Sequence, residues 1–252
     1  MPDRPRPYFS TLLPALMNAL LPGVCALCGG GCDGVVCAPC RAQYATPRPG
    51  RCQRCANPLP SPGDTCGTCG SCLADPPAFD ATVAAVDYAI PLDGLVLQLK
   101  FSARLALAPW FAQLLRDAIL ERRRCTPGGL ALPDLLCPVP LGERRLVERG
   151  FNQALEIARP LAASLGVALH PRLAERTTET TAQSGVTPAE RARNVRGAFA
   201  VADPDLVAGR HVGLVDDVMT SGHTLGELAA TFKRFGAARV TNLVFARTPP
   251  HS

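Results

Sequence analysis

Residues 212–225 read VGLVDDVMTSGHTL, and the predicted fold is built around this stretch. The apolar run VGLV is typical of a buried parallel strand. Asp216 and Asp217 follow this run directly, and the short turn Thr220-Ser221-Gly222 comes next. From His223 onward, leucine and phenylalanine recur at helical spacing. The sequence therefore predicts a strand, an acidic pair, a tight loop and a helix N-terminus, in this order.

This order of elements is suited to binding a phosphorylated sugar. The backbone N–H groups of residues 219–222 and the hydroxyls of Thr220, Ser221 and Thr224 can converge on one phosphate at the positive end of the helix. Carboxylates before the loop can accept hydrogen bonds from the hydroxyls of the attached sugar. Ligands of open α/β sheets bind outside the carboxyl ends of the strands, where this loop would lie. The alternative is an ordinary capped strand-turn-helix, since Ser, Thr, Asp and Gly also suit caps and turns.

The N-terminal part of the chain is rich in cysteine. Ten of the twelve cysteines lie between Cys25 and Cys72, mostly in C-x-x-C pairs, and no histidine lies among them. Two such pairs complete a tetrahedral four-thiolate zinc site, and a site without an open position is structural. The metal ligands that the spacing predicts are Cys25, Cys28, Cys37, Cys40, Cys52, Cys55, Cys69 and Cys72.

The spacing favours one zinc for the first four of these ligands and one for the last four. An interleaved pairing stays open. Cys32 and Cys66 are supernumerary, and because Cys66 also forms a C-x-x-C pair with Cys69, the identity of the last pair stays open as well. A disulfide cluster is the other alternative. It is less favoured because no convincing secretion signal precedes the cysteines.

The composition indicates a globular protein with more than one part. The chain has 252 residues, of which 47% are hydrophobic and 19% charged, and its net charge of +5 is too mild to indicate a nucleic-acid surface by itself. The apolar stretch Phe9–Leu21 is too short to span a bilayer, so we expect no transmembrane segment. We predict an N-terminal amphipathic segment over residues 1–22, a double zinc ribbon over 23–75 and an α/β domain over 78–248.

Apolar periodicity predicts the remaining elements of the α/β domain. The expected strands cover residues 83–89, 135–139, 198–201 and 240–245, and the expected helices cover 92–101, 109–124 and 152–166. Lys100 is either a surface lysine or a pyrophosphate contact. Arg149, in an arginine-rich connection, belongs either to an anion clamp or to a solvated loop. The polar segment 172–196 suits a flap that closes over phosphates.

The quoted stretches resemble those of a known family. VGLVDDVMTSGHTL resembles the phosphoribosyl-pyrophosphate (PRPP) binding motif of type I phosphoribosyltransferases. Together with the zinc-ribbon cysteines, PVPLGERRLVERGFNQ and TAQSGVTPAERARNVRGAF, it occurs in the order seen in the ComF family. The resemblance covers nearly the whole chain from about Leu21. It implies an α/β fold with a type I phosphoribosyltransferase-like parallel sheet flanked by helices, and a small N-terminal four-cysteine zinc-ribbon domain.

The resemblance also implies roles for individual residues. Asp216 and Asp217 would be the catalytic pair and would hold the ribose hydroxyls. Mg²⁺ would bind together with PRPP, and Zn²⁺ would be structural. The PRPP-binding residues would be Val218, Met219, Thr220, Ser221, Gly222, His223, Thr224, Arg149 and Lys100.

The function implied by the family is assistance in the uptake of single-stranded DNA during natural transformation (competence). The expected partners are PRPP, single-stranded DNA, a competence helicase and other DNA-processing proteins, and the expected place is the cytoplasm, peripheral to the inner membrane. Two alternatives stay open. One is an active phosphoribosyltransferase of nucleotide metabolism, and the other is a zinc-ribbon nucleic-acid-binding module with a vestigial PRPP site. The acceptor substrate, and whether a transfer occurs at all, are not identified by the sequence.

Overall fold

The protein divides into two compact units, residues Met1–Thr46 and Pro47–Ser252. The computed structural model describes residues 23–46, 50–59, 67–125, 130–177 and 197–249. The predicted amphipathic segment 1–22 lies outside the described residues. In the first unit, a two-stranded antiparallel ribbon precedes a short helix, and these elements are β1 (Gly23–Val24), β2 (Gly31–Cys32) and α2 (Ala38–Tyr44).

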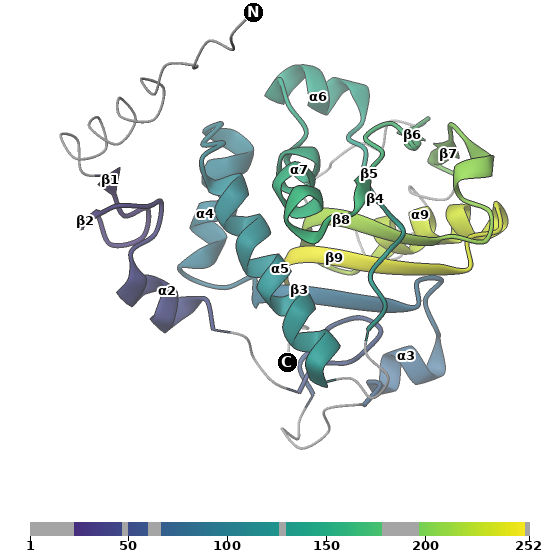
Figure 1. The fold of residues 1–252 in the computed structure, drawn as a ribbon, viewed down its shortest axis with the longest axis horizontal. Coiled ribbons are helices and arrows are strands. Elements are labelled where there is room, and N and C mark those ends of the chain that lie inside the picture. Colours follow the sequence, from purple (N-terminus) through teal and green to yellow (C-terminus); the bar gives the residue numbers. More distant parts are fainter. Residues whose placement is uncertain (1–22, 47–49, 60–66, 126–129, 178–196, 250–252) are drawn as a thin grey trace, which may run out of the picture. The chain divides into compact units, whose positions relative to one another are not determined.

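The second unit contains a five-stranded parallel sheet (Figure 1). Its strand order is β3-β9-β8-β4-β5, and every neighbouring pair is parallel. The predicted α/β fold with a parallel sheet is therefore confirmed. The strands are β3 (Ala81–Asp87), β4 (Leu135–Pro138), β5 (Ala168–Leu169), β8 (His211–Met219) and β9 (Arg239–Arg247).

Helices cover both faces of this sheet (Figure 1). On one face Phe245 of β9 stacks on Phe111, with ring centroids 3.6 Å apart. On the other face Val244 belongs to a buried cluster with Phe232. Side chains alternate along a strand, so successive residues of β9 reach opposite layers of helices. The helices are α5 (Leu107–Cys125) and α7 (Gln153–Leu165) on the Phe111 side and α9 (His223–Arg234) on the other.

Several short elements were not predicted. A helix, α6, occupies the arginine-rich connection after β4, and none of its residues is buried, so no apolar period marked it. The prediction that residues 172–196 form a loop is wrong for residues 174–176, which form a strand. This strand pairs with the predicted strand near residue 200 in a separate antiparallel sheet. The unpredicted elements are α6 (Glu143–Arg149), β6 (Ala174–Arg176) and the 3-10 helix η2 (Pro204–Leu206), and the predicted strand that pairs with β6 is β7 (Phe199–Val201).

The carboxyl ends of the strands bring together segments that are distant in sequence. α4 (Leu92–Phe101), which has the predicted bounds, ends near the segment that links α6 to α7. The strand β8 ends beside β9 and beside β4. The short helix α3 (Gly70–Ala74), which contains Cys72, belongs to the same unit as the sheet. The acidic pair that precedes the predicted binding loop lies beside α4 and α7.

Candidate functional site

The loop after β8 has the tight geometry that its sequence predicts. β8 ends at Met219 and α9 begins at His223. Gly222 precedes the helix with a φ of +83°, in the left-handed region that favours glycine. A Cβ at this position would lie 2.5 Å from Cε of Met219. The backbone angle therefore favours glycine here, whereas a small movement of the flexible end of the Met219 side chain would relieve the close contact.

The loop encloses a small polar hollow of about 50 Å³. One water molecule needs about 10–15 Å³, so the hollow has room for a few waters or one small tetrahedral anion. It opens at the N-terminus of α9, where unpaired backbone N–H groups and the helix dipole attract negative charge. The hollow is lined by Asp216, Val218, Met219, Thr220, Ser221, Gly222, His223, Thr224 and Leu225.

Asp216 and Asp217 have different surroundings although they are adjacent. Side chains alternate along β8, so the two carboxylates leave the strand on opposite sides. Asp216 is half-buried and lines the hollow, whereas Asp217 is only 2% exposed. The backbone N–H of Asp217 donates to Oδ1 of Asp216 over 2.9 Å. Of the acidic pair, Asp216 is the member that lines the loop hollow.

The surroundings of Asp216 disfavour its charge. Burial and the negative charge of Asp217 together raise the pKa of Asp216 well above its ordinary value. The positive charge of Lys100 lowers this pKa but does not compensate for burial. The site therefore contains one carboxyl group that holds its proton more tightly than a surface aspartate does.

Asp217 contacts residues from two helices. Nζ of Lys100, on α4, lies 2.7 Å from its Oδ2, and Nε2 of Gln153, on α7, lies 3.5 Å from its Oδ1. The lysine contact is an ion pair without hydrogen-bond alignment, because Oδ2 has no hydrogen-bond partner among the described residues. Lys100 lies beside the acidic pair, with 21% of its side chain exposed. It can therefore meet an anionic group of a ligand while it neutralises Asp217.

Arg149 connects this network to an exposed aromatic ring. Its NH1 donates to Oε1 of Gln153 over 3.0 Å, and its guanidinium lies 5.2 Å from the ring centroid of Phe101. Phe101 is 71% exposed. Burial lowers the pKa of Arg149, and Asp217 acts in the opposite direction. Sequence reasoning identified Arg149 but missed the part played by Phe101, for which the only signal was its place beside Lys100.

Other residues of the connection between β4 and α7 make contacts that do not involve the acidic pair. Nε of Arg144 pairs with Oε1 of Glu148 over 2.8 Å on the exposed face of α6. Asn152 caps α7, since its Oδ1 accepts from the N–H of Ala154, and its Nδ2 donates to the carbonyl of Val139. The RGFNQ segment therefore fixes the start of α7 against the end of β4, and it directs Arg149 and Gln153 to the acidic pair. Most of the expected flap, residues 178–196, lies outside the described residues.

The eight predicted cysteine ligands form two groups with the predicted sequential pairing. In each group the four sulfur atoms lie within 4.8 Å of one another, and the two groups are Cys25, Cys28, Cys37 and Cys40, and Cys52, Cys55, Cys69 and Cys72. In a tetrahedral site with metal–sulfur bonds of about 2.3 Å, sulfur atoms lie about 3.8 Å apart. The spacings of 3.8 Å between Cys28 and Cys37 and 3.5 Å between Cys55 and Cys69 fit this geometry. Either group could hold a metal ion.

All described cysteines are free thiols, and the thiols of one group are not equivalent. Burial alone would raise the pKa of Cys25, but backbone N–H groups, led by that of Cys28, lower it to about 6. Hydrogen bonding to the Cys37 thiol and burial raise the pKa of Cys40 to about 12. Metal binding to this group at neutral pH would therefore release protons. Cys66 lies outside the described residues.

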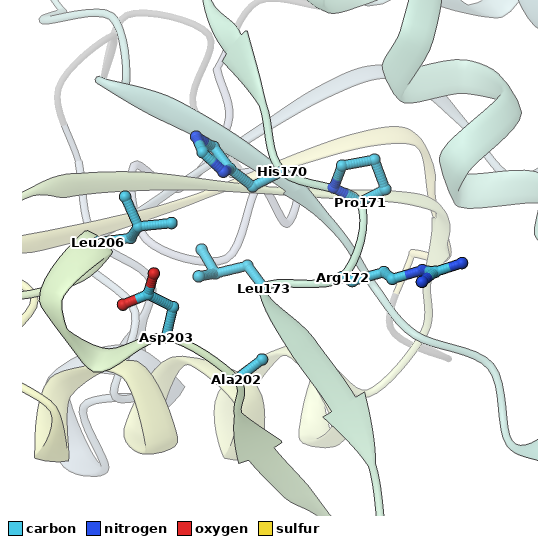
Figure 2. Close-up of a pocket in the computed structure, with 7 residues that line it drawn as sticks. All are labelled: His170, Pro171, Arg172, Leu173, Ala202, Asp203 and Leu206. Carbon is cyan, nitrogen blue, oxygen red and sulfur yellow. The ribbon is translucent and has the colours of Figure 1, made fainter.

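A larger hollow of about 400 Å³ lies between the segment after β5 and the segment after β7 (Figure 2). Oδ1 of Asp203 caps η2 by accepting from the N–H of Asp205. In Figure 2 the guanidinium of Arg172 points away from Asp203 and Leu206. None of the sequence-predicted site residues lines this hollow, which is formed by His170, Pro171, Arg172, Leu173, Ala202, Asp203 and Leu206.

None of the helices in the described part of the chain combines the length and the apolar character that crossing a bilayer requires.

Comparison with known proteins adds to this geometry. The phosphoribosyl transferase domain family matches residues 148–251, which include the RGFNQ segment, β8 and the loop. The solved structure of purine phosphoribosyltransferase from Pyrococcus horikoshii matches with a TM-score of 0.32 and 17% identity, over 54% of this chain and 70% of that chain.

Curated relatives match over nearly their whole length. The DNA utilization protein YhgH of Salmonella typhimurium is 38% identical over 231 residues, which cover 90% of this chain and 98% of the relative. Competence protein F of Haemophilus influenzae is 30% identical over 216 residues, which cover 81% of this chain and 93% of the relative. Because identity at this level extends over most of this chain and nearly all of each relative, the chain belongs to the ComF family, and its residues 148–251 match the phosphoribosyl transferase domain.

Proposed function

We propose that the chain binds PRPP at the loop after β8 and assists the uptake of single-stranded DNA in natural transformation. The observation that carries the first part is the hollow of about 50 Å³ at the N-terminus of α9, with Asp216 in its wall. A 5′-phosphate would accept hydrogen bonds from the loop N–H groups, and Asp216 would accept one from a ribose hydroxyl. The Lys100–Asp217 ion pair supports a place for the pyrophosphate beside the ribose.

Two cationic side chains beside the acidic pair would bind the negative charges of the pyrophosphate. Lys100, on α4, pairs with Asp217, and the charge of Arg149, the last residue of α6, interacts with the same carboxylate. In this proposal they bind the pyrophosphate, and Mg²⁺ bound with it would neutralise further negative charge.

Zn²⁺ is the ion we propose for both four-cysteine groups, since thiolate-only tetrahedral sites favour it.

Calorimetric titration with PRPP and Mg²⁺ tests the binding site. We expect the wild type to bind and the Asp216→Asn/Asp217→Asn variant to lose at least tenfold in affinity while it stays folded. A matched control is Asp203→Asn/Asp205→Asn, which neutralises two exposed carboxylates in the turn before β8 and should bind as the wild type does. The absence of binding to folded, metal-loaded wild type would contradict the proposal. Base-dependent release of pyrophosphate would instead indicate an active transferase of nucleotide metabolism.

The second part of the proposal concerns DNA. Two relatives bear the names competence protein and DNA utilization protein. The ring of Phe101, 71% exposed beside the Arg149 guanidinium, is the kind of surface on which single-stranded bases stack. We expect salt-sensitive binding of a single-stranded oligonucleotide that Phe101→Ala weakens and Leu97→Ala, one turn earlier on α4, does not. Equal binding by both variants would place the DNA elsewhere. A competence helicase and a position at the cytoplasmic side of the inner membrane complete the proposal.

A further inference from the structure

Arg247 lies at the end of strand β9, between β3 and β8, and has almost no contact with solvent. It is 5% exposed, and its neighbours in register are Asp87 at the end of β3 and Met219 at the end of β8. An arginine keeps its charge, so a buried guanidinium requires several hydrogen-bond acceptors. The hydrogen-bond acceptors of Arg247 therefore identify the segments that this buried side chain joins.

These partners belong to two different parts of the molecule. Nε of Arg247 donates to the carbonyl oxygen of Cys55 over 2.9 Å. NH1 donates to the carbonyl oxygen of Met219 over 3.0 Å, and to those of Thr220 and Thr248. One guanidinium thus joins the backbone of a predicted metal ligand to the backbone of the phosphate loop.

The cysteine group on one side of Arg247 is packed into the domain core. Cys52, Cys55 and Cys72 belong to the same buried cluster as Met219 and Leu225, which flank the loop. The backbone N–H of Thr82, on β3, donates to the carbonyl of Gln53 over 3.1 Å. This group is therefore part of the unit that contains the sheet, and its backbone is fixed to that unit at several points.

A second arginine supports the same junction. NH2 of Arg51 lies 2.6 Å from Oδ1 of Asp87, and its NH1 donates to the carbonyl of Ala56 over 3.0 Å. Ala56 directly follows Cys55 and adopts a left-handed φ of 57°. The turn that presents the Cys55 carbonyl to Arg247 is therefore held from both sides.

We infer that Arg247 is a positioning residue that couples the second cysteine group, Cys52, Cys55, Cys69 and Cys72, to the phosphate loop. A metal ion in this group fixes the turn at Cys55, the carbonyl of Cys55 fixes Arg247, and Arg247 fixes the carbonyls of Met219 and Thr220. The loop N–H groups then point into the hollow without the metal touching the ligand. The effect on PRPP affinity rests on the proposed function, whereas the effect on loop order does not.

The two cysteine groups supply a matched pair of variants. Cys37 and Cys69 each precede the short helix of their knuckle, with φ of −68° in both and ψ of 156° and 157°. Cys69→Ser removes a ligand from the group that contacts Arg247, and Cys37→Ser removes the equivalent ligand from the group in the other unit. Any general effect of losing one thiolate ligand is therefore common to both variants.

The test measures amide hydrogen exchange of residues 219–224 by mass spectrometry on the full chain, without PRPP. We expect Cys69→Ser and Arg247→Lys each to accelerate exchange in this segment at least tenfold. A lysine has one ammonium group and cannot span the Cys55 and Met219 carbonyls as the guanidinium does. Cys37→Ser should leave the segment unchanged, and the Cys69→Ser/Arg247→Lys double variant should be no worse than either single variant, because both break one pathway.

Calorimetry with PRPP and Mg²⁺ on the same variants gives the second measurement. Affinity should fall about tenfold for Cys69→Ser and for Arg247→Lys, and not for Cys37→Ser. The inference is overturned if Cys69→Ser leaves exchange at 219–224 unchanged, if Cys37→Ser has the same effect, or if faster exchange spreads equally through β4 and β8. A wild type that does not bind PRPP refutes the proposed function, while the exchange comparison still decides whether the coupling exists.

Discussion

At the scale of single residues, Asp216 is a loop-lining group whose ionisation is opposed by its surroundings. Its raised pKa means that the folded chain retains this proton at pH values where the unfolded chain has lost it. Stability therefore falls as the pH rises from the ordinary carboxyl pKa of about 3.9 to the raised value. Above this pH range the charged carboxylate of Asp216, a residue that we assign to ligand binding, lowers the free energy of unfolding.

Asp216→Asn should therefore stabilise the protein at neutral pH. The amide oxygen can still accept from the N–H of Asp217, and the unfavourable charge is gone. We therefore expect a gain in the free energy of unfolding at pH 7 that disappears near pH 4, where the unfolded carboxyl also holds its proton. Thermal unfolding at both pH values measures this. Glu175→Gln, on the exposed part of β6, should change neither value, and an equal gain at both pH values would refute the electrostatic explanation.

At the scale of elements, two glycines four residues apart differ in whether the backbone requires glycine. Gly222 has a positive φ that L side chains rarely adopt, whereas Gly226 lies inside α9, where a Cβ would approach Phe79 no closer than 4.0 Å. The first glycine is required by the turn, and the second only lowers the helix propensity of α9.

The substitutions Gly222→Ala and Gly226→Ala should therefore have opposite effects on stability. We expect the first to lower the free energy of unfolding by about 1–2 kcal/mol and to reduce PRPP affinity. The second should raise the free energy of unfolding by about 0.5–1 kcal/mol and leave affinity unchanged. Denaturant unfolding and calorimetry measure both quantities. Similar losses in the two variants would mean that the geometry of the turn at Gly222 has no special role.

The elements that could be predicted from the sequence are those with a long apolar pattern. α4 has its predicted bounds, and β8 and α9 flank the loop as expected. The elements that were missed are short. β5 has two residues and β6 has three, too few for a period of two to be recognised, and α6 buries no side chain. Their positions are determined by tertiary pairing, which leaves little trace in the local sequence.

The candidate site, too, could be predicted from the sequence only in part. The loop residues and the acidic pair could be identified because they are contiguous, but their partners come from distant helices. Gln153 contacts Asp217 across 64 residues of sequence, and the Arg247–Cys55 hydrogen bond spans 192 residues. Only the three-dimensional arrangement brings these groups together, so neither Phe101 nor Arg247 could be assigned to the site from the sequence.

At the scale of the whole molecule, the two cysteine groups belong to different units. We expect the full chain to bind about two zinc ions, and both Cys28→Ser and Cys55→Ser to retain about one. Only Cys55→Ser should lower the main thermal transition, by several degrees, since Cys55 belongs to the buried cluster of the sheet-containing unit. Metal analysis by mass spectrometry and scanning calorimetry measure these quantities. An equal loss of stability in the two variants would contradict the separation of the two groups.

The strand order has a consequence for how the chain is made. β3 is the first strand of the sheet along the chain and β9 the last, yet they are direct neighbours, and Asn242 of β9 bonds to Thr82 of β3 across 160 residues. During translation β3 and β8 both leave the ribosome before the strand that joins them. Until residue 247 has emerged, the edges that β9 will pair with are open to other chains, so the unfinished protein is most exposed to aggregation during this interval.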